Sequence, residues 1–103
     1  MIKVLVFIAF TLVSFTATAE GDVEAGKQKA VICASCHGQQ GISLTDIWPN
    51  LAGQKQGYLV KQMMDYRAGN RSDPSMDAMM KMLSDDDVKN IAAYYSSLPG
   101  CSE

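Results

Sequence analysis

The sequence predicts an all-α fold with three main helices joined by loops. Three segments show the apolar spacing of an amphipathic helix, and no segment shows the alternation of a half-buried strand. There is no internal repeat and no second domain boundary in the 103 residues, a length that suits one domain. A domain this short buries a thin core and usually needs a staple such as a disulfide, a metal or a cofactor.

The first 19 residues are expected to be a signal peptide. Lys3 gives a positive start, residues 4–13 are almost wholly apolar, and residues 17–19 (Ala-Thr-Ala) form a small-x-small cleavage signal. A membrane-spanning helix usually needs roughly 20 apolar residues, so this run is too short for an anchor. We therefore expect residues 1–19 to be removed on export to the periplasm, leaving residues 20–103 without stable membrane insertion.

The first and last helices have recognisable start signals. Asp22 is a suitable N-cap for a helix that runs toward Cys33. Ser84 caps the last helix, whose first turn (residues 85–87) holds three aspartates that the helix dipole favours. Pro99-Gly100 ends this helix, and its buried stripe is expected to consist of Val88, Ile91, Ala92 and Tyr95.

Gly26 lies inside the first helix, where glycine costs roughly 1 kcal/mol relative to alanine. Either it is merely tolerated, or another helix approaches closely at this point. We expect it to mark the crossing with the last helix, against Ile91, Tyr94 or Tyr95.

The middle of the chain is expected to hold one helix between two loops. Glycines and a proline punctuate residues 38–53, and a helix follows over residues 56–68, closed by Gly69. Residues 71–82 are polar and rich in methionine, and we expect them to form a loop.

Cys33-x-x-Cys36-His37, at the end of the first helix, is the most specific motif and is typical of c-type haem attachment. Two thiols three positions apart on one helical turn can each add to a vinyl group of the same porphyrin. The next residue, the one histidine in the chain, can then ligate the iron from below.

Three other uses of these residues explain the pattern less well. A thioredoxin-like dithiol would require a βαβ pattern, and a plain disulfide would leave His37 unexplained. A zinc site of Cys33, Cys36, His37 and Cys101 would need two adjacent residues as ligands of one tetrahedral ion. Covalent attachment of one haem c through Cys33 and Cys36 accounts for the motif best.

The second axial ligand must come from the methionines if it comes from this chain, since no other histidine exists. Met63 and Met64 resemble core residues. Met76 follows Pro74-Ser75 in the expected loop and is the leading candidate, with Met79 and Met80 close behind.

The chain is similar to small bacterial class I cytochromes c of the c-553 type and to either half of the dihaem periplasmic cytochromes. The similarity rests on several short sequence motifs that occur in the same order and at the same spacing as in that family. These motifs are Gly21-Asp22 with Gly26, Cys33–Gly38, Pro49–Gln54, Tyr58-Leu59-x-x-Gln62, Gly69-x-Arg71, Leu83-Ser84-Asp85 and Ile91–Tyr95.

The resemblance implies a class I cytochrome c fold, three main helices and loops around one covalent haem c. His37 would be the proximal ligand, Met76 the sixth ligand, and the Pro49 carbonyl would accept the free imidazole N–H of His37. Arg71 would pair with a haem propionate, with a solvated arginine as the alternative. The haem pocket walls are expected to include Trp48, Leu51, Tyr58, Leu59 and Met63.

The expected function is transfer of single electrons between redox proteins, without conversion of a substrate. A membrane quinol-oxidising complex and a terminal oxidase or reductase are the expected partners. The alternatives are a cytochrome subunit of a larger dehydrogenase, and a haem sensor or enzyme with an open sixth site. With a net charge of −2 and no basic patch, nucleic-acid binding is not expected.

Cys101 has no cysteine partner in the chain once Cys33 and Cys36 hold haem. It is either a tail thiol without a role or the site of a disulfide-linked dimer, and we predict the dimer.

Overall fold

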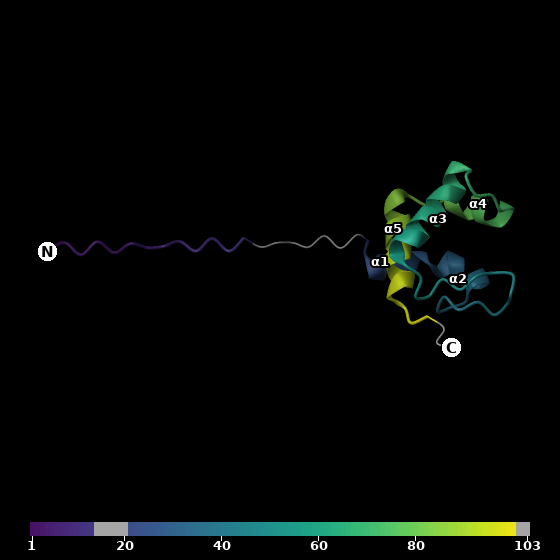
Figure 1. Ribbon diagram of the computed structural model, residues 1–103, viewed down its shortest axis with the longest axis horizontal. Coiled ribbons are helices and arrows are strands. Elements are labelled where there is room, and N and C mark those ends of the chain that lie inside the picture. Colours follow the sequence, from purple (N-terminus) through teal and green to yellow (C-terminus); the bar gives the residue numbers. More distant parts are fainter. Residues whose placement is uncertain (14–20, 101–103) are drawn as a thin grey trace.

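The computed structural model describes residues 1–13 and 21–100, and within these ranges it contains helices and no strand (Figure 1). The all-α class is therefore confirmed, although the helices number five where three main ones were expected. They are α1 (Val23–Lys29), α2 (Val31–His37), α3 (Gln56–Ala68), α4 (Pro74–Lys81) and α5 (Asp85–Ser97).

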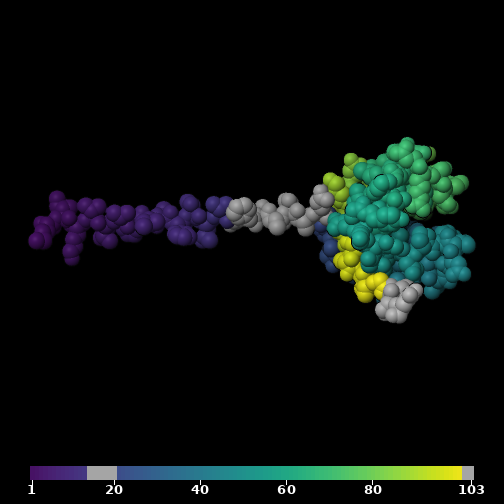
Figure 2. Space-filling view, in the orientation of Figure 1, coloured from purple at the N-terminus to yellow at the C-terminus, as the bar shows by residue number. Residues whose placement is uncertain are grey.

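Residues 1–13 carry no regular secondary structure and are exposed, and they extend away from the helical domain (Figures 1 and 2). The expected cleavage site at residues 17–19 and Cys101 lie outside the described residues, so both expectations stay predictions. Among the residues that the structure describes, no helix is long and apolar enough to cross a membrane.

The expected first helix is divided into α1 and α2 at Ala30, which is buried. The Cys33 backbone N–H bonds the Ala30 carbonyl three residues back (2.9 Å), so the chain makes a tight turn of 3₁₀ type here. The prediction of one continuous helix was wrong for this reason. α2 then continues through the whole Cys-x-x-Cys-His motif.

α1 crosses α5 at Gly26, as expected. A Cβ atom at this position would lie 1.9 Å from the Asn90 carbonyl oxygen and 3.0 Å from the Ile91 nitrogen, so only glycine allows the two backbones to approach this closely. The nearest neighbours are thus the backbone of Asn90 and Ile91, and the rings of Tyr94 and Tyr95 are not among them. The side chain of Asn90 also accepts a hydrogen bond from the Asp22 backbone N–H, at 2.8 Å.

α5 forms the centre of the core. Its predicted stripe is confirmed, because Val88, Ile91, Ala92 and Tyr95 are each at most 2% exposed. Ser84 and Asp87 form the capping box that opens this helix. α3 packs against α5 through the buried Leu59, and Gly69 closes α3 in the left-handed conformation (φ 80°).

The loop predicted over residues 71–82 is instead the helix α4. The Asp73 carboxylate accepts hydrogen bonds from the Ser75 and Met76 backbone N–H groups, and Pro74 occupies the first helical position, where its missing N–H costs nothing. The buried Met80 anchors this helix in the core. Asp73-Pro74 is a sequence pattern typical of a helix start, but the polar residues around it are equally typical of a loop.

Candidate functional site

A cavity of about 340 Å³ lies in the domain and is lined by residues of α2, α3, α4, α5 and the loop of residues 47–54. This volume is in the range of small-molecule sites, roughly 300–1,000 Å³. The five side chains expected as pocket walls all line it: Trp48, Leu51, Tyr58, Leu59 and Met63.

Cys33, Cys36 and His37 line this cavity from the last turn of α2. Cys33 and Cys36 form no disulfide with each other. Burial raises the pKa of the Cys33 thiol, and a hydrogen bond with Tyr95 offsets part of that rise. Tyr95 therefore contacts Cys33, whereas the sequence predicted only that Tyr95 is a buried core residue. Its position in the apolar stripe of α5 indicates burial, but nothing in the sequence indicates contact with Cys33.

The alternative zinc site would include Cys101, which lies outside the described residues. Among residues 1–13 and 21–100, no three His, Cys, Asp or Glu side chains gather as a metal-binding group. Cys33, Cys36 and His37 therefore do not converge on one tetrahedral ion.

His37 is buried, and its Nδ1 lies 2.8 Å from the Pro49 carbonyl oxygen. A carbonyl can only accept, so Nδ1 carries the proton, and a neutral imidazole then keeps the lone pair of Nε2 free for a metal. The hydrogen bond that the resemblance implied is present. It fixes the ring and raises the basicity of the ligating nitrogen.

The turn after α2 brings Pro49 to His37. Gly38 has φ 87°, and a Cβ atom there would lie 1.9 Å from the Ile42 carbonyl oxygen, so the chain folds back tightly at once. The Gly41 carbonyl then accepts from the backbone N–H groups of Leu51 and Ala52 at 2.8 and 3.0 Å. This closed loop holds Pro49 against the imidazole.

α4 supplies methionines to the same cavity. Met76, Met79 and Met80 are spaced i, i+3 and i+4, which places them on one helix face, and all three line the cavity. Met80 is fully buried, whereas Met76 and Met79 are half-buried. Met82 is 63% exposed and Met64 does not line the cavity. The structure thus brings the leading candidate Met76 to the site, together with its two rivals.

Arg71 is the cationic side chain that lines the cavity. Its guanidinium donates to the Gln62 side-chain oxygen at 2.6 Å and lies 4.7 Å from the centre of the Tyr66 ring. It is therefore held at the rim, where a carboxylate of a bound group could pair with it.

The donor set fits a haem. Two thiols and a histidine with a free Nε2 line a largely apolar cavity that also receives methionine sulfur, and His/Met is an axial pair that haem iron takes in cytochromes c.

Comparison with known proteins gives the same picture. The family model described as "Cytochrome c" matches residues 23–99. The chain is 43% identical over 110 residues to cytochrome c4 of Stutzerimonas stutzeri, covering 97% of this chain and 52% of that protein. It therefore spans about half the length of such curated relatives.

Two solved structures resemble the fold. Reduced recombinant cytochrome c4 from Pseudomonas stutzeri matches with a TM-score of 0.76 and 42% identity, over 79% of this chain and 47% of that one. A thiosulfate dehydrogenase from Marichromatium purpuratum matches with a TM-score of 0.73 and 31% identity, over 79% of this chain and 19% of that one.

Proposed function

This chain belongs to the cytochrome c family and binds haem c covalently through Cys33 and Cys36, and from that premise we propose that it is an exported protein that transfers single electrons through one His/Met-ligated haem. His37 is the proposed proximal ligand and Met76 the proposed sixth ligand.

One observation carries this proposal: the cavity that receives the Cys-x-x-Cys-His motif also receives the methionine face of α4. A haem bound here supplies an iron that cycles between the +2 and +3 states. If His37 and a methionine of α4 both ligated that iron, no coordination position would be left for a substrate. Such a site suits electron transfer better than catalysis.

The surrounding residues act on the haem in three ways. The Pro49 carbonyl keeps the His37 ring oriented by its 2.8 Å hydrogen bond. Apolar side chains such as Leu51 and Leu59 disfavour the extra charge of the oxidised haem and so raise the reduction potential. Arg71, at the rim, is placed to pair with a propionate.

We further propose export to the periplasm with removal of residues 1–19, and exchange of electrons with other redox proteins. A membrane quinol-oxidising complex would serve as donor, and a terminal oxidase or reductase as acceptor. Docking of such electron-transfer partners is usually small and transient.

A redox titration of the purified holoprotein tests the function. One reversible wave that fits one electron per chain, with one haem per chain that resists acid–acetone extraction, is the expected result. Haem in the organic layer, or a reduced form that dioxygen oxidises with turnover of a substrate, would contradict the proposal.

A cytochrome subunit of a larger dehydrogenase is the second candidate. It is favoured by the likeness to the thiosulfate dehydrogenase structure, of which this chain covers only 19%. Purification from the native cell extract separates the two: a free shuttle elutes as a small monomer or dimer, whereas a subunit co-elutes with a dehydrogenase in fixed ratio.

A further inference from the structure

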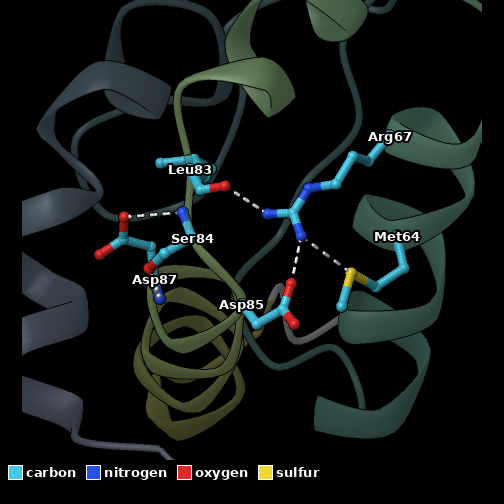
Figure 3. A network of polar contacts seen from close by, with 6 residues as sticks. All are labelled: Met64, Arg67, Leu83, Ser84, Asp85 and Asp87. Carbon is cyan, nitrogen blue, oxygen red and sulfur yellow. Dashed lines mark hydrogen bonds and ion pairs between the residues drawn. The ribbon is translucent and has the colours of Figure 1, made fainter.

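The side chain of Arg67 connects the end of α3 to the start of α5 (Figure 3). Its Nη2 donates to the Leu83 carbonyl, and its Nη1 donates to a carboxylate oxygen of Asp85. The Met64 sulfur also lies 3.6 Å from Nη1. The planar fork of an arginine presents its donors in a fixed geometry, which the single ammonium nitrogen of a lysine does not reproduce.

These contacts join the two ends of the segment that carries α4, residues 68–82. The Leu83 and Asp85 bonds span 16 and 18 residues of chain, and all of α4, including Met76 and Met79, lies between their ends. Inside the segment, α4 is packed on α3 and is anchored by Met80. Arg67 is therefore the polar connection that holds both ends of this segment together.

Burial indicates which of the two bonds contributes more. The Arg67 side chain is 28% exposed but Asp85 is 69% exposed, and exposed ion pairs are usually worth little. The bond to the Leu83 carbonyl is part-buried, and bonds from charged donors are stronger than neutral ones. The carbonyl contact should therefore dominate.

We propose that Arg67 is a positioning residue that keeps the methionine face of α4 on the haem iron, by closing the segment between α3 and α5. This inference rests on the proposed His/Met ligation. It assigns no contact between Arg67 and the haem, because Arg67 does not line the cavity.

The proposal predicts how readily an external ligand replaces the methionine. Imidazole binds ferric iron only in the open state, so its apparent affinity scales with the open fraction. Loss of a part-buried bond from a charged donor should raise that fraction about tenfold. The imidazole Kd of Arg67→Gln should therefore fall about tenfold, and Asp85→Asn should change it less.

The control is Lys61→Gln on the same helix. Lys61 pairs with Asp65 at 2.6 Å within α3 and does not reach the segment that carries α4. Its loss removes one positive charge, as Arg67→Gln does, and should leave the imidazole Kd unchanged within about twofold.

The experiment is a spectroscopic imidazole titration of the ferric holoprotein in two backgrounds, unchanged and Met76→Ala. In the Met76→Ala background imidazole does not have to displace a methionine from the iron. Arg67→Gln should then change the imidazole Kd by less than about twofold. An equal effect in both backgrounds, or no effect in either, would overturn the proposal.

Failure of the ligand assignment is read separately. A methionine–iron bond gives ferric haem a far-red charge-transfer band. If Met76→Ala retains this band, Met76 is not the ligand. The titration is then repeated with whichever of Met79→Ala or Met80→Ala abolishes the band. If no methionine variant abolishes it, the His/Met function fails. If Met76→Ala gives no holoprotein, Arg67→Lys is compared with Arg67→Gln. The lysine ammonium can still donate to the Leu83 carbonyl, so a Kd nearer to that of the unchanged protein supports the proposal, and a Kd equal to that of Arg67→Gln contradicts it.

Discussion

The histidine side and the methionine side of the cavity differ in how the candidate ligand is held. On the histidine side, His37 directly follows the second attachment cysteine on α2, and the Pro49 carbonyl fixes its ring at 2.8 Å. On the methionine side, α4 brings three methionines to the cavity from a segment whose ends are joined through Arg67.

The difference indicates a division of tasks. The histidine side combines adjacent residues of α2 with a tight glycine turn and a part-buried hydrogen bond to Pro49, 12 residues away, so it is expected to stay fixed through the redox cycle. The methionine side depends on contacts 16 and 18 residues apart, so it is the side expected to open first. Perturbations of the two sides should therefore have different consequences.

The largest effect is expected on the histidine side. Cys36→Ser removes one of the two attachment points, so most of the haem should be missing from the mature protein. Haem staining of a denaturing gel measures this. Cys101→Ser is the matched control and should stain normally; equal staining of both variants would contradict attachment at Cys36.

Met76→Ala should have the next largest effect, and on ligation alone. Haem attachment should be normal, the far-red band of the ferric protein should vanish, and the reduction potential should fall because the thioether ligand is lost. Visible spectroscopy with a redox titration measures both. A band that survives here but disappears in Met79→Ala or Met80→Ala would move the ligand along the same helix face.

Gly26→Ala tests the crossing of α1 and α5. The new Cβ atom would meet the Asn90 carbonyl at 1.9 Å, and such overpacking typically costs about 1–3 kcal/mol. The melting temperature should then fall by roughly 4–8 °C for each kcal/mol.

The control for Gly26→Ala is Gly57→Ala on α3, where a Cβ atom meets nothing within 4 Å. Thermal unfolding followed by circular dichroism should show little change or a slight gain for this variant. Equal losses for the two variants would mean that the α1–α5 crossing is not what Gly26 serves.

The smallest effect is expected at the start of α5, beside the Arg67 contacts. The pKa of Asp87 lies below its usual 3.8, chiefly because its carboxylate accepts the Ser84 backbone N–H, with a further contribution from Lys29. The stabilisation is thus complete above about pH 4 and is lost as the pH falls through the lower folded pKa.

Asp87→Asn should therefore lower the melting temperature slightly at pH 7, and the difference from the unchanged protein should shrink at pH 3. Asp86→Asn removes the same charge in the same turn without touching the capping box, and is the control. If the difference in melting temperature between Asp87→Asn and the unchanged protein grew as the pH fell, the stabilising role of the Asp87 carboxylate would be contradicted.

Local patterns were predictable from the sequence, and long-range contacts were not. The attachment motif, the Ser84 cap and the closing Gly69 each lie within a few residues, so spacing alone indicated them. The helix α4 was missed because its cap, Asp73-Pro74, lies among polar residues that favour a turn equally well.

The choice of methionine and the role of Arg67 depend on three-dimensional packing. Residues 76, 79 and 80 share one face of a helix, so helical periodicity does not separate them, and the preference for Met76 rests on its place after Pro74-Ser75 and on the family resemblance. The acceptors of Arg67 lie 16 and 18 residues away, and nothing in the local sequence relates it to Leu83. The split of the first helix at Ala30 was likewise not visible, because alanine favours a continuous helix.

Carbon monoxide binding to the reduced holoprotein tests the central claim most directly. Both axial positions are proposed to be filled, by His37 and by a methionine of α4, so the spectrum of the ferrous protein should not change when carbon monoxide is added at neutral pH. Met76→Ala should bind it at once and show a shifted Soret band. An immediate shift in the unchanged protein would mean an open sixth position, and the site would then be that of a haem sensor or enzyme.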